Sequence, residues 1–205
     1  MPRAAAPGGP PPAPVAVHPA SDLDDVTALV GPRRPDATVC FCLGYRIGSA
    51  ENRRLRGPAR RERVRELCAE DPPPGVIASL GGEPVAWAAI HPRADTAFAR
   101  SRSIPHVDDL DVWSLWCLRV RPGYRGTGLT APLIAGAVRF ALDRGAPAVE
   151  AYPLDNRGET VDTTMAYVGT RAMFERAGFR VAAATSSRLD GFPRVLMRLA
   201  PGDES

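Results

Sequence analysis

The sequence predicts a single α/β domain, because segments typical of strands and of helices alternate along a chain of about one domain's length. The chain has 205 residues, whereas a typical domain has roughly 150. We therefore expect one core at residues 14–200 with short tails at 1–13 and 201–205. Apolar residues make up 44% and charged residues 24% of the chain, values usual for a soluble globular protein. The predicted order is β, α, α, β, β, β, α, β, α, β, β.

The first half of the chain is expected to form a strand, two helices and a β-hairpin after a disordered, Pro/Ala-rich tail at 1–13. Val15–Val17 indicates a short strand, and Ser21 is placed to cap a helix whose apolar residues recur at helical spacing. Two apolar runs meet at Gly81-Gly82, which is typical of a tight hairpin turn. The expected segments are residues 15–17, 21–30, 58–70, 75–80 and 84–91, with an ambiguous apolar run at 38–43.

The second half is expected to begin with a loop at 93–110 and to continue as alternating strands and helices. Residues 112–120 (VWSLWCLRV) form the strongest strand pattern in the sequence. A helix follows from about Gly128, because Pro132 is tolerated only in a first helical turn, and Gly145 ends it. The other expected segments are a strand at 147–152, a helix at 165–177 and closing strands at 181–185 and 194–199.

Composition excludes several classes of protein. No run approaches the roughly 18 apolar residues of a membrane span, and the first twenty residues lack the apolar segment of a secretory signal, so a cytoplasmic protein is expected. All 26 basic residues are arginine, which excludes a catalytic or Schiff-base lysine. The cysteines include no C-x-x-C pair, so we expect neither a disulfide scaffold nor a metal site. They are Cys40, Cys42, Cys68 and Cys117.

A glycine-rich turn between a strand and a helix is the most informative feature. Residues 125–130 (RGTGLT) combine glycines, an arginine and a helix N-terminus, a combination that binds phosphate. Residues 126–131 also fit the dinucleotide pattern G-x-G-x-x-A, with Glu150 about 20 residues on. Too little chain follows Glu150 for a doubly wound sheet, so we do not favour that interpretation.

Two motifs resemble those of the GNAT N-acetyltransferases. Residues 118–129 (LRVRPGYRGTGL) resemble that family's acyl-CoA motif, [Q/R]-x-x-G-x-[G/A], and residues 170–179 (TRAMFERAGF) resemble its penultimate helix. The resemblance implies a mixed twisted sheet of six to seven strands with about four helices, opened between the strands at 112 and 147. It also implies acetyl-CoA as co-substrate, with backbone groups of Leu118 and Val120 around the pantetheine arm and the amides of 125–130 on the pyrophosphate.

The full set of cofactor-binding residues that the resemblance implies is Leu118, Arg119, Val120, Arg125, Gly126, Thr127, Gly128, Leu129, Thr130 and Phe174. Thr130 departs from the family, which prefers glycine or alanine there. Phe174 stands where many members have the tyrosine that protonates the leaving thiolate, and Tyr167 replaces a common asparagine. The acid is therefore displaced or absent.

Candidates for the chemistry lie on strands and loops. Glu150 and Tyr152 share one face of a strand, and Glu150 is the leading base, with a structural salt bridge as the alternative. Tyr152 and Tyr167 are candidates for the acid, with aromatic packing as the alternative. The remaining candidates are Ser114 and Asp111 for binding substrate, His91 and His106 as bases, and Cys117 as a nucleophile.

The expected activity is transfer of an acetyl group to a primary amine of a small molecule, without metal, nucleic acid or membrane. Seven arginines between Arg53 and Arg65 could bind nucleic acid or an acidic partner, but interleaved glutamates favour a solvated helix face. They could also favour an acceptor that bears a carboxylate or phosphate. A degenerate CoA-binding module is a further alternative, and a homodimer formed through the C-terminal strands is plausible.

Overall fold

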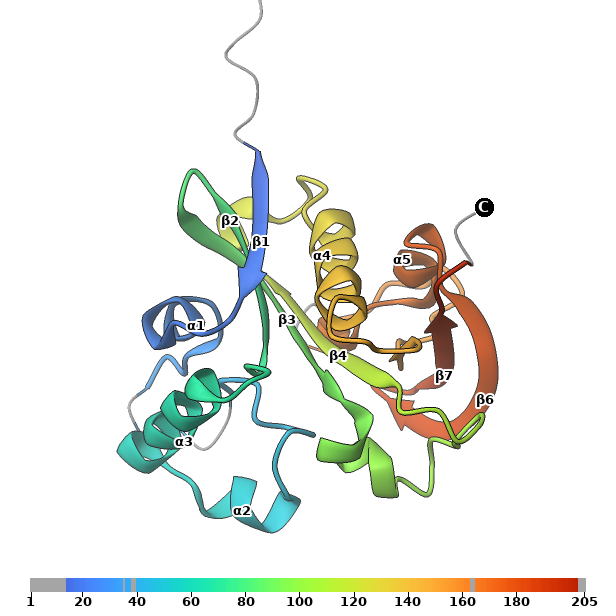
Figure 1. Cartoon of the computed structure of the whole chain (residues 1–205), viewed down its shortest axis with the longest axis horizontal. Coiled ribbons are helices and arrows are strands. Elements are labelled where there is room, and N and C mark those ends of the chain that lie inside the picture. The colour runs from blue at the N-terminus through green and yellow to red at the C-terminus, as the bar shows by residue number, and fades with distance from the viewer. Residues whose placement is uncertain (1–13, 35, 38–39, 163–164, 203–205) are drawn as a thin grey trace, which may run out of the picture.

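The computed structural model describes residues 14–34, 36–37, 40–162 and 165–202, so the predicted tail at 1–13 lies outside the described residues. Its centre is a seven-stranded sheet in the order β1-β2-β3-β4-β5-β7-β6 (Figure 1). The strands are β1 (Val15–Pro19), β2 (Gly75–Leu80), β3 (Glu83–Pro92), β4 (Trp113–Val120), β5 (Val149–Ala151), β6 (Arg180–Leu189) and β7 (Phe192–Leu199). The helices are α1 (Leu23–Val30), α2 (Ser49–Arg54), α3 (Gly57–Ala69), α4 (Thr130–Leu142) and α5 (Arg171–Arg176).

The sheet is mixed, as predicted, because β4 and β5 run parallel while the other described pairs are antiparallel. Pairing between β4 and β5 covers three residue pairs and ends at Leu115 and Ala151. Beyond that point β4 continues to Val120, whereas the chain after β5 turns away. The second half of β4 therefore has an open edge. At the other end of the sheet β6 is an edge strand, and dimerisation through it stays a prediction.

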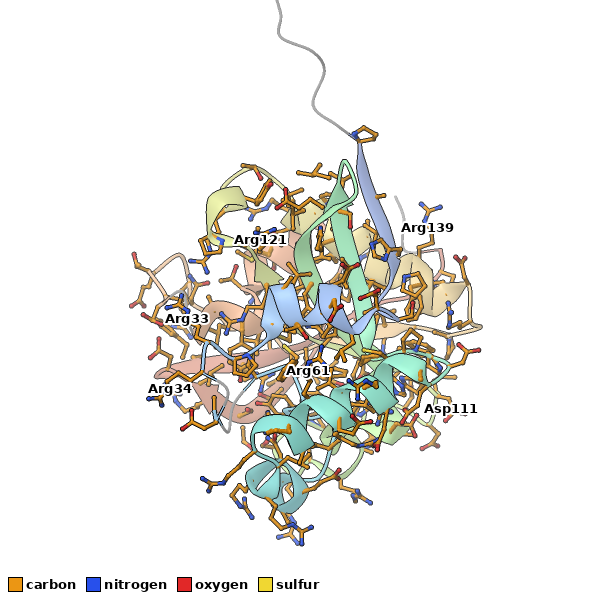
Figure 2. The ribbon with its side chains drawn as sticks, turned by 90° about the vertical axis from the view of Figure 1, so that its left-hand side faces the viewer. Arg33, Arg34, Arg61, Asp111, Arg121 and Arg139 are labelled. Carbon is orange, nitrogen blue, oxygen red and sulfur yellow. The ribbon has the colours of Figure 1, made fainter. Side chains whose placement is uncertain are left out.

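Helices cover both faces of the sheet and divide the core into two clusters. On one face α4 packs across β1, β2 and β3, and α5 packs on β7. On the other face α1 packs on β3 and β4 and against α3, and apolar residues of α3 and of the segment 40–47 belong to the same cluster; Figure 2 views the molecule from the side of α1 and α3. The site described below lies where both clusters meet the open edge of β4.

Three predicted elements differ from the structure for local reasons. Asp22, not Ser21, caps α1, because its carboxylate accepts hydrogen bonds from the N–H groups of the first helical turn. The predicted helix at 165–177 divides into a 3-10 turn at Met165–Val168 and α5, because Gly169 takes a φ of +75°. β6 and β7 are longer than predicted, since they meet in a tight turn at Asp190-Gly191. α2 was not predicted.

Short 3-10 helices at Arg93–Asp95 and Ala97–Arg100 lie in the long loop before β4, and a third at Pro122–Tyr124 follows β4. None of the helices within the described ranges is both long and apolar enough to cross a bilayer.

Candidate active site

A β-bulge in β4 directs two consecutive side chains to the same face. Ala89 of β3 pairs with Cys117 and Ile90 pairs with Leu115, so Trp116 is an extra residue on β4. Without the bulge, Trp116 and Cys117 would point to opposite faces. Instead both belong to the cluster under α1 and α3, whereas Leu118 belongs to the cluster under α4.

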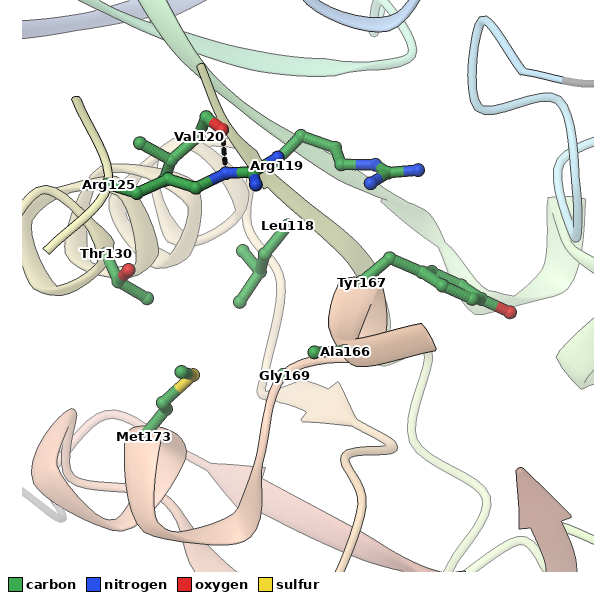
Figure 3. Close-up of a pocket in the computed structure, with 9 residues that line it drawn as sticks. All are labelled: Leu118, Arg119, Val120, Arg125, Thr130, Ala166, Tyr167, Gly169 and Met173. Atoms are coloured by element: carbon green, nitrogen blue, oxygen red, sulfur yellow. Dashed lines mark hydrogen bonds between the residues drawn. The ribbon is translucent and has the colours of Figure 1, made fainter. Parts of the chain in front are cut away.

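The backbone of β4 presents free polar groups to the open edge. The Arg121 N–H donates to Val85 O of β3 at 2.9 Å. Because backbone groups alternate between the two sides of an antiparallel strand, those of Val120 and Leu118 point away from β3, into the gap left by β5. The Val120 carbonyl accepts a hydrogen bond from Arg125 Nε at 3.2 Å, which folds that side chain over the strand end (Figure 3).

The glycine loop after β4 leads into an uncapped helix. Gly126 and Gly128 have φ values of +76° and +83°, which glycine adopts at little cost. No atom lies within 4 Å of a Cβ built at either position, so the loop faces open space there. No side chain caps the N-terminus of α4, so the N–H groups of its first turn and the helix dipole are available to an anion. This geometry fits a pyrophosphate.

A first pocket, of about 160 Å³, follows the open edge of β4 from the glycine loop (Figure 3). The predicted cofactor residues that line this pocket are those on β4, Arg125, and Thr130 at the start of α4. Residues of the 3-10 turn and of α5 complete the lining. Its lining is Leu118, Arg119, Val120, Arg125, Thr130, Ala166, Tyr167, Gly169 and Met173. Phe174 does not line it but is buried against Phe179, with ring centroids 5.1 Å apart. We therefore assign Phe174 to packing beneath the pocket.

A second pocket, of about 300 Å³, adjoins the first, and both include Arg119 and Tyr167. In Figure 3 these two side chains extend away from Thr130 and Met173. The second pocket is formed by the bulge of β4, the segment after α1, and residues of α2 and α3. Its lining is Cys40, Cys42, Gly44, Tyr45, Asn52, Arg60, Trp116, Cys117, Arg119 and Tyr167.

Tyr167 lies at the junction of the two pockets. Burial raises the pKa of its hydroxyl, and a hydrogen bond with Tyr45 contributes in the same direction. The hydroxyl is therefore protonated across the neutral range and can donate a proton. Of the predicted catalytic side chains, Tyr167 is the one that lines both pockets.

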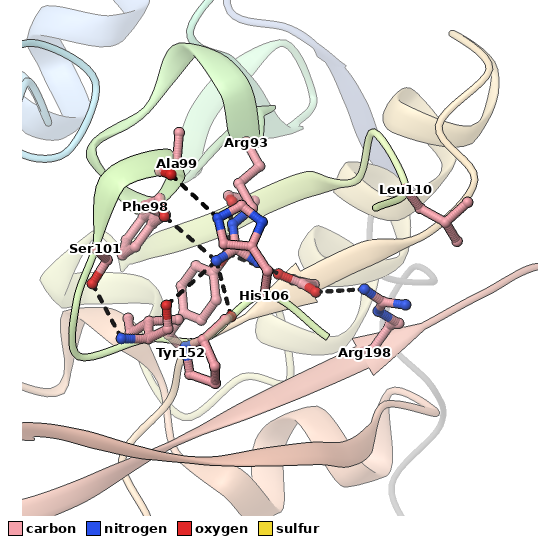
Figure 4. Close-up of polar contacts among 12 residues, drawn as sticks. Arg93, Phe98, Ala99, Ser101, His106, Leu110, Tyr152 and Arg198 are labelled. Carbon is pink, nitrogen blue, oxygen red and sulfur yellow. Dashed lines mark hydrogen bonds and ion pairs between the residues drawn. The ribbon is translucent and has the colours of Figure 1, made fainter. Parts of the chain in front are cut away.

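Glu150 is buried in a network of charges and lines neither pocket; Figure 4 shows polar contacts of its partners Arg93 and Arg198. Its two carboxylate oxygens accept hydrogen bonds from Arg93 Nη1 at 2.6 Å and Arg198 Nη2 at 2.7 Å. Arg198 also pairs with Asp108, while Arg93 donates to Pro105 O at 2.9 Å. The network ties the loop before β4 to β5 and β7. Both carboxylate oxygens of Glu150 are engaged by guanidinium groups, and the side chain lines neither pocket, which favours the structural alternative for Glu150.

Tyr152 and Ser114 belong to the same buried network. The Tyr152 hydroxyl lies 2.8 Å from Ser114 Oγ and donates to Glu150 at 3.1 Å. Burial raises the pKa of Tyr152, and neither side chain lines the two pockets. Asp111 is exposed on the loop before β4, roughly 20 Å of strand length from Leu118. These positions favour packing for Tyr152 and Ser114, and Asp111 is remote from the pockets.

The remaining candidates have structural contacts. His91 is buried, lies 3.3 Å from Asp95 and has a pKa lowered by burial, whereas His106 is exposed and bonded to Ala99 O. Cys42 Sγ lies 2.9 Å from Cys117 Sγ. Across the described part of the chain, no cluster of His, Cys, Asp or Glu has the geometry to hold a metal ion.

The basic run is divided between the surface and the interior. Arg61, Arg63 and Arg65 pair with carboxylates of α1, α2 and α3, whereas Arg60 is buried and lines the second pocket. The second pocket is also lined by Arg60, Tyr45 and Trp116, which were not predicted from the sequence as site residues. A bulge leaves no local signal in a strand pattern, and helical spacing alone does not distinguish a buried arginine from its exposed neighbours.

Comparison with known proteins gives the family. The model described as the acetyltransferase (GNAT) family matches residues 45–179, which is more than half of the chain. The chain belongs to the GNAT acetyltransferase family. This confirms the resemblance inferred from residues 118–129 and 170–179, and the predicted acyltransferase class follows from it. A search of curated proteins found no match.

Solved structures share the GNAT fold at low sequence identity. An uncharacterized protein from Bacillus halodurans is 14% identical with a TM-score of 0.52, covering 91% of this chain and 83% of that chain. Ard1 from Thermoplasma volcanium is 12% identical with a TM-score of 0.50, and the match covers 91% of this chain and 97% of that chain. An aminoglycoside acetyltransferase, AAC(6')-Ib in complex with coenzyme A, is 18% identical with a TM-score of 0.45, covering 62% of this chain. This GNAT chain spans 66% of that enzyme's chain, just under two thirds.

Proposed function

We propose that this GNAT protein transfers an acetyl group from acetyl-CoA to a primary amine of a small molecule, by direct attack in a ternary complex. The observation that carries the proposal is the pair of adjoining pockets that share Arg119 and Tyr167. The first pocket begins beside an uncapped helix N-terminus and follows a free strand edge, as a long phosphate-bearing donor requires. The second pocket opens at the same junction and has room for an acceptor.

The residues of the first pocket suit coenzyme A. The N-terminus of α4, reached through Gly126 and Gly128, would hold the pyrophosphate. The Leu118 carbonyl and the Val120 N–H, which point away from β3, would hydrogen-bond the amides of the pantetheine arm, whereas the Val120 carbonyl already accepts from Arg125. Acetyl-CoA supplies the acetyl group as a thioester.

Proton transfer at the junction is assigned to Tyr167 and to water. The Tyr167 hydroxyl lies where the two pockets meet and, like any tyrosine, carries its proton at neutral pH, so it would serve as the acid for the departing sulfur. The Leu118 N–H faces the gap and would stabilise the developing oxyanion. No carboxylate or histidine is present among the described residues that line either pocket, so the amine would enter neutral and lose its proton to water after attack. Glu150 and Tyr152 would support the sheet beneath.

Calorimetric titration of CoA into the wild type and two variants tests the donor site. Gly128→Asp places a carboxylate beside the pyrophosphate, where like charges about 4 Å apart repel by roughly 4 kcal/mol. Gly128→Asn has the same size and a similar tolerance of positive φ without the charge. We expect Gly128→Asp to bind CoA at least 100-fold more weakly than Gly128→Asn, with both variants folded by circular dichroism.

Equal affinity in the two variants, or no binding by the wild type, would refute the donor site. Release of free thiol from acetyl-CoA in the presence of amines then tests the reaction. Tight CoA binding with no turnover on any primary amine would favour the alternative of a CoA-binding module.

A further inference from the structure

The second pocket carries positive charge that no carboxylate among the described residues pairs with. Arg60 and Arg119 line it, and Arg194 lies behind Tyr45, with its guanidinium 5.8 Å from the ring centroid. None of these three arginines forms an ion pair with a described residue, whereas Arg63 nearby pairs with acidic residues of α2 and α3. In a chain with nearly equal numbers of acids and bases, 23 and 26, such a grouping creates a local positive field.

Arg60 is a built cationic site rather than a surface side chain. It is 1% exposed, and it donates four hydrogen bonds, all to neutral oxygens of Cys40, Leu55 and Asn52. A guanidinium has five N–H donors, so these bonds use four and fix its orientation but do not neutralise its charge. Burying an unpaired charge is costly. A bound anion would remove that cost.

Other donors around the second pocket lack partners. The indole Nε1–H of Trp116, a residue 2% exposed, has no hydrogen-bond partner within the described structure. Arg194 Nη2 is also buried without one, while its Nη1 donates to the Tyr45 hydroxyl at 3.4 Å. Buried donors without acceptors are rare in folded proteins. Trp116 lines the second pocket and Arg194 lies behind its Tyr45 wall, although buried donors without partners also occur away from it, at Arg46, Trp87, Arg93 and Arg198.

From these contacts we infer that the second pocket takes an amine that also carries an anionic group, a carboxylate or a phosphate. The inference rests on the proposed acetyl transfer, whose acceptor it specifies. Guanidinium groups bind both anions, and Arg60 has one N–H left for such a bond. A polycationic acceptor such as an aminoglycoside would instead meet two lining arginines, with a third behind Tyr45, and no described carboxylate, an arrangement that repels it. The aromatic and thiol side chains of Trp116, Tyr45, Cys42 and Cys117 add an apolar wall that suits an acceptor with an apolar body.

Binding of matched amines to the enzyme saturated with CoA tests the inference. Phenylalanine and phenylalaninol differ in a carboxylate against a hydroxymethyl group, and phosphoethanolamine and ethanolamine differ in a phosphate. Kanamycin serves as the polycation. We expect at least one anionic member to bind 10-fold or more tighter than its neutral match and than kanamycin, and to be acetylated faster. The pair whose two members differ in affinity shows whether the preferred anionic group is a carboxylate or a phosphate.

Variants of the lining arginines test which side chain gives the preference for anionic amines. Arg60→Gln should reduce the anionic-to-neutral affinity ratio at least 10-fold, and Arg60→Lys should restore part of it. Arg119→Gln, at a half-buried position, gives the same test where Arg60→Gln fails to fold by thermal melting. Tighter binding of the neutral amines or of kanamycin, or no binding by any anionic amine at 10 mM, would overturn the inference. A wild-type protein that does not bind CoA would instead overturn the proposed function, so the two failures are distinguishable.

Discussion

Replacing Glu150 by glutamine tests whether this carboxylate supports the fold or accepts a proton. Its side chain is 0% exposed, and two arginine nitrogens lie 2.6 and 2.7 Å from its oxygens. Glutamine keeps the shape but presents an NH2 group where one arginine needs an acceptor. Removing one partner of a buried ion pair costs about 3–5 kcal/mol of unfolding free energy. Arg198 keeps Asp108, whereas Arg93 has no second carboxylate partner among the described residues, so we expect a loss of about 4 kcal/mol.

The assay is thermal and urea unfolding followed by circular dichroism. For a chain of this size, 1 kcal/mol shifts Tm by about 2–4 °C, so Glu150→Gln should melt roughly 8–16 °C below the wild type. Glu83→Gln is the matched control, because Glu83 also pairs with an arginine, Arg121 at 2.5 Å, but on the surface; its Tm should not change measurably. A Glu150→Gln protein that melts with the wild type but loses about 100-fold or more in kcat would refute this reasoning and make Glu150 the base.

Three further predictions follow from the site and the core. Tyr167→Phe keeps the ring but removes the proposed acid, so kcat should fall by roughly 10²–10⁴-fold while calorimetry gives a similar CoA affinity; an unchanged kcat would exclude the assignment. Because burial raises the pKa of Tyr167, its proton stays bound in alkaline solution, and wild-type kcat should not fall between about pH 8 and 9.5; a descending limb there, below the ordinary tyrosine pKa near 10, would contradict this. Gly136→Ala should destabilise the protein by about 1–2 kcal/mol in urea despite better helix propensity, because the new Cβ would lie 2.4 Å from a methyl group of Val17; equal stability would mean that β1 yields.

Much of the fold was predictable because its signals are local. The hairpin at Gly81-Gly82, the strand at 112–120 and the helix placed by Pro132 depend on residues within a few positions of one another, and all three are present. The helix expected at 165–177 is interrupted at Gly169, whose φ of +75° breaks the helical backbone. Packing also favours glycine at this position, because a Cβ at Gly169 would lie 2.8 Å from the Phe174 ring.

The glycine loop was predictable for the same reason, whereas the partners of the candidate residues were not. Glu150 is fixed by Arg93, 57 positions away along the chain, and by Arg198, 48 positions away. A carboxylate in a strand suggests either a base or an ion pair, and the choice depends on what other elements bring to it. The second pocket likewise combines segments after α1, in α3, on β4 and before α5, which no spacing rule relates.

The arginines around the second pocket also explain how the amine could react without a dedicated base. Only a neutral amine can attack a thioester, and nearby cations lower the pKa of an ammonium. A guanidinium about 6 Å away at an effective dielectric constant near 20 contributes roughly 3 kcal/mol, or about 2 pH units. An anionic group on the acceptor would neutralise one of the three unpaired arginines, Arg60, Arg119 and Arg194, and leave a net positive field at the amine. We therefore expect the ascending limb of kcat with pH to have its midpoint at least 1 pH unit below the acceptor's solution pKa, and to move toward that value in Arg119→Gln. A wild-type midpoint at the solution pKa would mean that the field does not reach the amine, and a base would then have to be sought elsewhere.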